Sequence, residues 1–409
     1  MPKQINFTAA EQTLCALLGS ALFGTPSPKN PKDLTGALQL AQAHAVQGVF
    51  GEGLSALPED ALPTEALLSL QEDTVILLRQ NEALRAERRA LCAFCREAGI
   101  PLVLLKGDTV ARLYPTPELR VAGDIDCLLP PAYHAPVAAF LTTRGYTYLK
   151  KDGEDHHTVY KKGHAEVELH TAVHGIPSGE MGEKVAAALA GVIPSAVTAT
   201  LQDDTLPMPC PTHQGLILLL HLQQHLREGG VGLRQVLDWA LFLQKDLPSA
   251  DTPALCAQLS SLGLLRFAEV LTTAAVRHLG LPTTASPFAA CEAPTADALL
   301  ADILGSGNFG RASKTHTGST PLTSRAPGQR SAIASALSYV VRKCKEEWKI
   351  AKKCPPLLVF FVPYFILRRL VCGKRIHPGM LRAALKRNRL YDKLRLFEPT
   401  AKKENKEFP

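Results

Sequence analysis

The chain has 409 residues, of which 46% are hydrophobic and 20% are charged, a composition typical of a soluble globular protein. Its length permits a large buried core and predicts two or three domains. The ten cysteines follow no disulfide framework, which excludes the disulfide-stabilised secreted class, and residues 1–24 have no pattern of a secretory signal. We therefore expect a cytoplasmic protein.

Charge is distributed unevenly along the chain. The net charge is +7, but residues 331–409 hold 19 Lys and Arg against 6 Asp and Glu. The remainder of the chain is therefore acidic, with a net charge of −6. This contrast predicts that the basic C-terminal segment has a partner of its own.

Residues 1–100 are predicted to form an N-terminal helical scaffold. Thr8-Ala-Ala-Glu11 has the form of a capping box, and residues 34–48 have helical spacing. Residues 64–98 contain neither Gly nor Pro, which indicates one long helix or two abutting ones.

Residues 101–175 change to a pattern of short strands and helices. A strand over 101–105 ends at a Lys106-Gly107 turn, and helical spacing resumes at 108–114. We predict further elements in the order strand 121–129, helix 132–144, and strands 146–150, 157–161 and 165–170. The predicted fold class is α+β, a small mixed sheet flanked by helical segments.

The rest of the chain is divided by composition. Residues 176–304 are predicted to be a helical domain, and residues 305–331 a flexible linker rich in Gly, Ser, Thr and Pro. A Gly-x-Gly-x-x-Gly at Gly305, Gly307 and Gly310 follows a helical pattern rather than a strand, so it does not predict dinucleotide binding. Residues 332–409 form a basic, partly apolar tail.

The stretch "VAGDIDCLLP" places two aspartates in an otherwise apolar strand. Residues i and i+2 of a strand share a face, so Asp124 and Asp126 direct their carboxylates to one place. One interpretation is a solvated strand end after a Gly-Asp turn. The other is a divalent metal site, since hard cations take carboxylate oxygens as ligands.

A third candidate carboxylate lies in a second strand, "GHAEVELHT". Apolar residues alternate there with His164, Glu166, Glu168 and His170, so one face is polar. Glu168 or Glu166 would complete an oxygen cage if this strand lies beside the first, whereas an ordinary solvent-facing strand explains the pattern equally well. The histidines at 156, 157, 164, 170 and 174 raise the alternative of zinc, but their spacing matches no zinc motif.

These elements in this order resemble the nucleotidyltransferase superfamily built on the DNA polymerase beta fold. More closely, residues 97–245 resemble a bacterial family of uncharacterised nucleotidyltransferases. That family's pattern is a Leu-Lys-Gly turn, an Arg shortly before Asp-Ile-Asp, and a Glu-x-His strand; here these are "LLKG", Arg120, "DID" and "VELH".

The resemblance implies transfer of an NMP from an NTP to an acceptor hydroxyl, with release of pyrophosphate. Asp124, Asp126 and Glu168 would hold Mg²⁺ or Mn²⁺ and would be the catalytic residues. Backbone N–H groups after Gly107 would bind phosphate oxygens. Lys106 and Arg120 are candidates to bind the phosphate charge as well.

Further candidates for the cleft come from the match to the family's pattern. They are His170, His221, His225, Arg234 and Asp238. Taken alone, an i, i+4 pair such as Arg234 and Asp238 is typical of a helix surface. Nothing in the sequence selects the acceptor.

Three other readings stay open. An Asp-x-Asp glycosyltransferase is a minor alternative, because only one strand and one short helix precede the motif. The chain could instead be a catalytically degenerate nucleotide-binding protein that docks on a membrane surface. In that case "LLVFFVPYFIL" (357–367), too short to span a bilayer, would lie on anionic lipid between its basic flanks, giving a peripheral location. A core helix explains the run as well, and nucleic acid ranks below a membrane because no recognised motif accompanies the charge.

Overall fold

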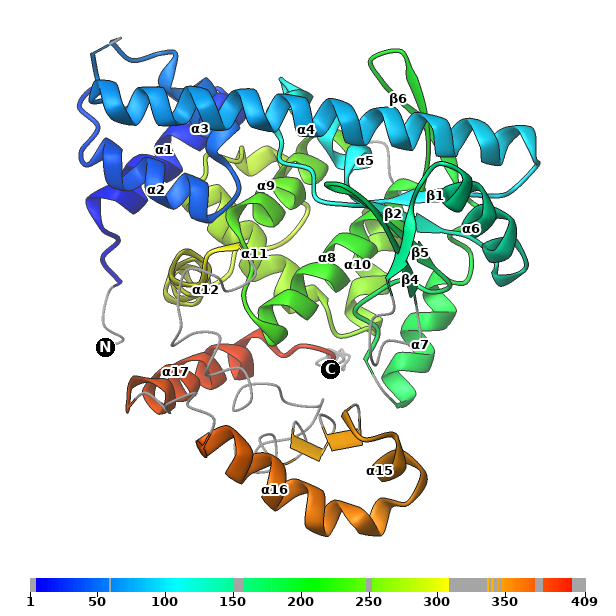
Figure 1. The fold of residues 1–409 in the computed structure, drawn as a ribbon. Helices are drawn as coiled ribbons and strands as arrows, with labels where there is room; N and C mark the ends of the chain where they lie inside the picture. Colours follow the sequence, from blue (N-terminus) through cyan, green and yellow to red (C-terminus); the bar gives the residue numbers. More distant parts are fainter. Residues whose placement is uncertain are drawn as a thin grey trace, which may run out of the picture.

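The computed structural model describes residues 5–58, 60–149, 157–177, 179–247, 252–308, parts of 337–371, and 378–398. It consists of a five-stranded mixed sheet packed among helices, with a separate two-stranded hairpin (Figure 1). The predicted α+β class is confirmed.

The N-terminal residues form four helices, α1 (Ala9–Phe23), α2 (Leu34–Ala43), α3 (Gln47–Leu54) and α4 (Thr64–Glu97). The predicted capping box opens α1: the Glu11 amide donates to Thr8 Oγ1 at 3.2 Å, and the Thr8 amide donates to the Glu11 carboxylate at 2.7 Å. Figure 1 shows α4 running along the whole top of the molecule, from α1–α3 to the sheet. The long Gly- and Pro-free stretch is thus one helix that connects the two halves of the structure.

The sheet has the strand order β1-β2-β5-β4-β3. Its strands are β1 (Val103–Leu105), β2 (Ile125–Leu128), β3 (Thr147–Leu149), β4 (His157–Lys162) and β5 (Ala165–His170). Strand β2 pairs antiparallel with β1 and parallel with β5. The connections contain α5 (Asp108–Ala111), two short 3₁₀ turns at Pro117–Leu119 and Pro131–Tyr133, and α6 (His134–Thr143).

The two faces of the central strands differ in chemistry. One face is apolar and packs against α4 and α6, with a core that includes Leu91, Cys95, Ile125, Cys127, Val137, Leu141, Val167 and Leu169. The alternate residues of β2 and β5, Asp126 and Glu168, face the other way. Period-two alternation thus places acidic groups on the face opposite a dry core.

Residues 176–304 are not wholly helical. After α7 (Glu180–Leu189), strands β6 (Val197–Leu201) and β7 (Asp204–Met208) form a hairpin whose Leu201 and Leu206 join the apolar core of the sheet. The sequence pattern does not predict this hairpin, because Pro207 interrupts the second strand and the pairing is stabilised by contacts with the core of a distant sheet.

The remaining helices form a bundle beside the sheet. They are α8 (Pro211–Glu228), α9 (Leu233–Leu241), α10 (Thr252–Ser261), α11 (Leu265–His278) and α12 (Ala293–Ser306). A π-helical turn, Phe242–Asp246, follows α9, and a 3₁₀ turn, Thr283–Ala285, follows α11. Trp239 is fully buried at the centre, where its indole N–H donates to Thr272 Oγ1 at 3.0 Å.

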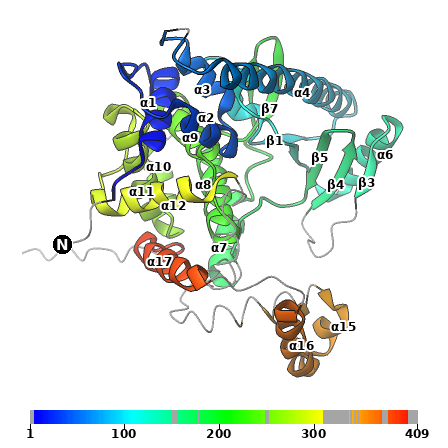
Figure 2. The same cartoon turned by 60° about the vertical axis from the view of Figure 1, so that its left-hand side comes forward.

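The C-terminal residues form α15 (Lys349–Lys353), a 3₁₀ turn (Pro355–Leu357), α16 (Leu358–Val371) and α17 (Pro378–Leu394). Helix α17 belongs to the bundle: the Arg387 guanidinium donates to the Leu226 carbonyl at 2.8 Å, and Leu394 and Phe397 are buried. Figures 1 and 2 both show α15 and α16 standing apart from the bundle. The basic tail therefore contains two parts with different packing.

The predicted linker and the Gly-x-Gly-x-x-Gly pattern lie mostly outside the described residues. The structure describes this segment only up to residue 308, so Gly310 is not included.

Among the helices that are described, none combines the length and apolarity that a bilayer crossing requires.

A buried ion-pair network fastens α4 to α5 and to the β6–β7 hairpin. The Arg88 guanidinium lies 2.7 Å from the Asp108 carboxylate at the start of α5 and 2.6 Å from the Asp204 carboxylate in the hairpin. Its side chain is 3% exposed, while that of the neighbouring Arg89 is 41% exposed. Arg88 thus joins three segments that are distant in sequence.

We expect Arg88→Met to lower the free energy of unfolding by about 3 kcal/mol, because it leaves two largely buried carboxylates without their main partner. Arg89→Met is the matched control and should cost below about 1 kcal/mol, since exposed ion pairs contribute little. Urea denaturation monitored by circular dichroism gives both values. Equal losses for the two variants would contradict this role of Arg88.

Candidate active site

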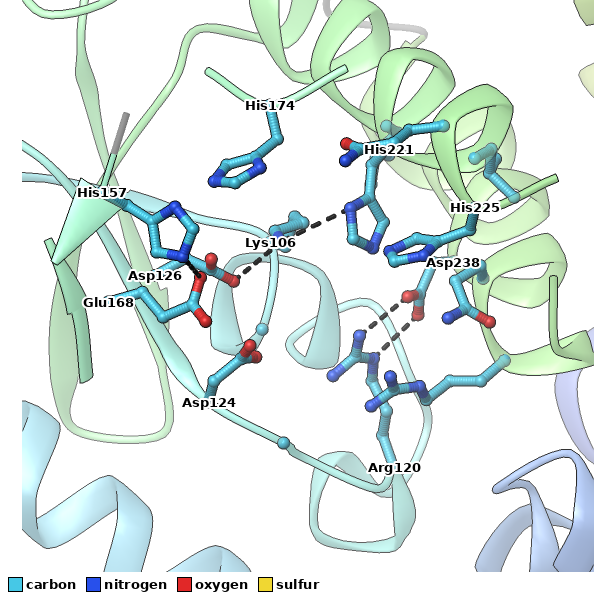
Figure 3. Close-up of a pocket in the computed structure, with 17 residues that line it drawn as sticks. Lys106, Arg120, Asp124, Asp126, His157, Glu168, His174, His221, His225 and Asp238 are labelled. Carbon is cyan, nitrogen blue, oxygen red and sulfur yellow. Dashed lines mark hydrogen bonds and ion pairs between the residues drawn. The ribbon is translucent and has the colours of Figure 1, made fainter. Parts of the chain in front are cut away.

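A cavity of about 220 Å³ lies between the polar face of the sheet and helices α8 and α9 (Figure 3). The sheet side contributes Lys106, Gly107, Asp124, Asp126 and Glu168. The helical side contributes His221, His225, Arg234 and Asp238, and Arg120 lies between the two sides. The structure therefore brings together in one cavity all but one of the predicted site residues; the exception, His170, lies directly behind Asp126.

The three predicted carboxylates converge. Asp126 and Glu168 are direct partners in the parallel register of β2 and β5, and Asp124 precedes Asp126 by two residues. Each of the three can place one oxygen within 4.8 Å of the others, and Asp126 and Glu168 are 3% and 8% exposed. Such a set of buried oxygens has the donor chemistry that Mg²⁺ or Mn²⁺ requires.

Mutual repulsion separates the titration of the two aspartates. The neighbouring Asp126 charge, together with burial, raises the pKa of Asp124 to about 6. Burial would also raise the pKa of Asp126, but Lys106 and a hydrogen bond from His170 lower it well below its ordinary value. Ionisation of Asp124 is thus less favourable than ionisation of Asp126.

The Lys106-Gly107 turn aims an ammonium group at this cluster. Both residues have left-handed backbone conformations, with φ of 57° and 52°, and the Lys106 carbonyl accepts from Thr109 Oγ1 at 2.7 Å. Lys106 Nζ lies 2.9 Å from Asp126 Oδ2 and 3.5 Å from His221 Nδ1. The turn therefore partly neutralises the acidic charge.

Arg120 and Asp238 form a bidentate pair across the cavity. Arg120 Nε and one terminal nitrogen each lie 2.7 Å from an Asp238 oxygen, and Tyr114 donates to the same carboxylate at 2.8 Å. Both charged residues are about 95% buried. Asp238 is therefore the partner of Arg120, rather than of Arg234 on its own helix.

Arg234 is differently placed. Its guanidinium donates to the Val121 carbonyl at 2.6 Å, and its buried Nε has no hydrogen-bond partner. Burial and the Arg120 charge lower the pKa of Arg234 from its ordinary value. This half-buried cation lines the cavity from helix α9, whereas the carboxylates line it from the sheet.

Histidines line much of the cavity. On α8, the rings of His221 and His225 have centroids 4.2 Å apart, and burial lowers the pKa of both, that of His225 to about 4. Burial would lower the pKa of His170, but hydrogen bonds to Asp126 and Glu168 raise it; its Nε2 lies 2.8 Å from Asp126 Oδ1. His157 and His174 also line the cavity.

Sequence analysis names His157 and His174 only for the zinc alternative, which their spacing does not support, and does not place them beside the carboxylates. The position of His157 could have been predicted from the sequence. If β4 and β5 are paired as an antiparallel hairpin, His157 lies directly opposite His170. Tyr114, the third partner of Asp238, gives no such signal, because its contact joins residues 124 positions apart.

A protein-family model described as uncharacterised nucleotidyltransferase matches residues 30–280, more than half of the chain. The chain belongs to this family. The match extends from just before α2 to the end of α11 and so contains the whole cavity. It confirms the resemblance found in the sequence. A comparison with curated proteins found no match.

We expect the affinity for Mn²⁺ to fall by about tenfold per pH unit below pH 6 and to level off above it, because a cation must displace the proton of Asp124. The sign follows from the raised pKa: protonated Asp124 is favoured at low pH, and its ionised form, which binds the cation, is favoured above pH 6. Titration of Mn²⁺ at pH 5 and pH 7 by electron paramagnetic resonance measures this. Asp124→Asn should flatten the dependence, and an unchanged slope in that variant would contradict the assignment.

Proposed function

We propose that this protein transfers an NMP from an NTP to an acceptor hydroxyl. Family membership supports nucleotidyl transfer in general, and the three convergent carboxylates support a metal-dependent form of it. The single observation that carries the proposal is the side-by-side register of Asp126 and Glu168, which completes the carboxylate cluster around Asp124. Membership of this family also argues against an Asp-x-Asp glycosyltransferase.

Asp124, Asp126 and Glu168 would hold the divalent cation. The fit rests on their chemistry: three carboxylates that can each place an oxygen within 4.8 Å of the others offer a cation only oxygen ligands, and the Asp126 charge together with burial raises the pKa of Asp124. When bound, Mg²⁺ or Mn²⁺ would neutralise phosphate charge and polarise the α-phosphate.

Lys106 and Arg234 are the cations that we assign to the triphosphate. Lys106 already lies at the acidic cluster, and Arg234 lines the same cavity from α9 with an unused Nε. Arg120, with its bidentate partner Asp238, would position the loop before Asp124 rather than bind phosphate directly. Gly107 would let phosphate approach the backbone closely.

The reaction is an in-line displacement at the α-phosphorus. The acceptor oxygen forms the new P–O bond, the bond to the β-phosphate oxygen breaks, and pyrophosphate leaves with that oxygen. Glu168 would help to hold the cation near the acceptor hydroxyl, whose proton passes to water as the new bond forms. The acceptor stays undefined by the site.

Asp126→Asn should reduce NTP-dependent labelling of an acceptor by at least about 100-fold and should weaken NTP binding, since it removes a ligand oxygen charge and the partner of Lys106. The assay incubates the full chain with each α-³²P nucleotide, Mg²⁺ or Mn²⁺, and cell extract. Chelation of the divalent metal should have the same effect as the substitution.

Asp203→Asn, in the exposed turn of the hairpin, is the matched control and should label like the wild type. Calorimetry distinguishes transfer from docking. Equal NTP affinity with and without metal, and no labelled product for any nucleotide, would favour the catalytically degenerate protein.

We also infer that α16 contacts an anionic membrane surface. Val359, Phe360, Tyr364 and Leu367 on this helix are 55–73% exposed. The other side of the helix is covered, because Trp348 stacks on Phe361 with ring centroids 4.9 Å apart. The exposed apolar face lies within the basic segment of the chain, a combination typical of helices that lie in a lipid interface.

Phe360→Glu with Leu367→Glu should abolish sedimentation of the full chain with anionic vesicles at 50 mM salt, because charge is introduced on the apolar face. Leu68→Glu with Ile76→Glu on α4 is the control pair; each of those residues is 53% exposed. Binding by the wild type should fade towards 1 M salt, where the Debye length is about 3 Å. A wild-type chain that ignores such vesicles at low salt would refute the membrane contact.

A further inference from the structure

Three imidazoles and a carboxylate gather at the edge of the cavity, beside the acidic cluster. His157, Glu168, His170 and His174 can each place one ligand atom within 4.8 Å of the other three. The centroids of the three imidazole rings are 4.6–5.2 Å apart. Figure 3 shows His157 and His174 above Glu168, whereas Asp124 lies below it.

The backbone fixes these side chains from three segments. His157 and His170 are direct partners in the antiparallel pairing of β4 and β5, and Glu168 is two residues before His170 on the same strand. His174 follows in the turn after β5, which is anchored to α8: Gln223 donates to the Gly175 carbonyl at 2.7 Å. Gly175 has φ of 85°, and a Cβ there would lie 2.4 Å from the Leu220 carbonyl oxygen, so glycine permits the turn to approach α8 this closely.

The cluster has unused nitrogen atoms. His170 is 0% exposed, and its Nε2 lies 2.8 Å from Asp126 Oδ1, while its Nδ1 is buried without a hydrogen-bond partner. The Nε2 of His174 is also buried without a partner. Burying an imidazole nitrogen without a partner costs free energy, and a ligand that accepts its lone pair would recover that cost.

We propose that His157, Glu168, His170 and His174 form a second metal site, which binds a transition-metal ion of the Zn²⁺ class. Imidazole nitrogens with one carboxylate are typical ligands of such ions, whereas Mg²⁺ prefers oxygen alone. Asp126 accepts from His170 Nε2 and so leaves Nδ1 as the ligand nitrogen, in the manner of carboxylates that orient metal-binding imidazoles. The site shares Glu168 with the acidic cluster, and the proposal does not depend on nucleotidyl transfer.

The test uses Co²⁺ as the probe on the full chain after dialysis against a chelator. We expect visible absorption bands of four-coordinate Co²⁺ at one equivalent, and a 1,000-fold excess of Mg²⁺ should leave them unchanged while Zn²⁺ removes them. His174→Ala should weaken Co²⁺ binding by at least tenfold. His213→Ala, a half-buried histidine of α8 outside the cavity, and Asp124→Asn, in the acidic cluster only, should both keep the bands.

Several outcomes would overturn the site. These are wild-type protein without such bands, displacement of Co²⁺ by Mg²⁺, and loss of the bands in Asp124→Asn but not in His174→Ala. Circular dichroism checks that His174→Ala is folded. If it is not, the Mg²⁺ and Zn²⁺ competition on the wild type decides, since it requires no variant.

Discussion

The parallel register of β2 and β5 is the constraint on which the site depends. It sets Asp126 beside Glu168 and leaves Ile125, Cys127 and Val167 in the apolar core on the opposite face. Because side chains alternate with period two, a slip of one residue would turn Glu168 into that core and Val167 towards the cavity. Burial of apolar side chains on one face therefore specifies the acidic geometry on the other.

Helix α4 extends this control to the loop before Asp124. Asn81 is buried, and its side-chain amide donates to the Glu118 and Arg120 carbonyls at 2.7 and 2.8 Å and accepts from the Ala122 amide at 3.2 Å. Seven residues later, Arg88 binds Asp108 in the turn that presents Lys106. One continuous helix thus fixes both the start of α5 after β1 and the loop before β2, which explains why the N-terminal scaffold is part of the functional unit rather than an appendage.

Sequence patterns predicted those parts of the site that alternation and local turns determine. The Asp-x-Asp parity, the polar face with Glu168 and the Lys106-Gly107 turn are local properties, and the structure has all three. Partner choice between distant segments is not local: Arg120 lies 118 residues from Asp238, and His174 meets His157 only because β4 and β5 pair in one register. The β6–β7 hairpin was missed for the same reason, since its short strands gain their stability from Leu201 and Leu206 in the core of the sheet.

The charges that line the cavity are divided between two sides. Asp126 and Asp238 each have a close cationic partner, Lys106 and Arg120 respectively. Asp124 and Arg234 lack such a partner among the ion pairs of the described residues; Asp124 comes from the sheet side of the cavity and Arg234 from the helical side. A cation alone would satisfy the acidic wall and leave the basic wall unbalanced, while a polyanion alone would be repelled by the acidic wall. A ligand that carries both a cation and a polyanion, as a metal-bound triphosphate does, complements the charge of both walls at once.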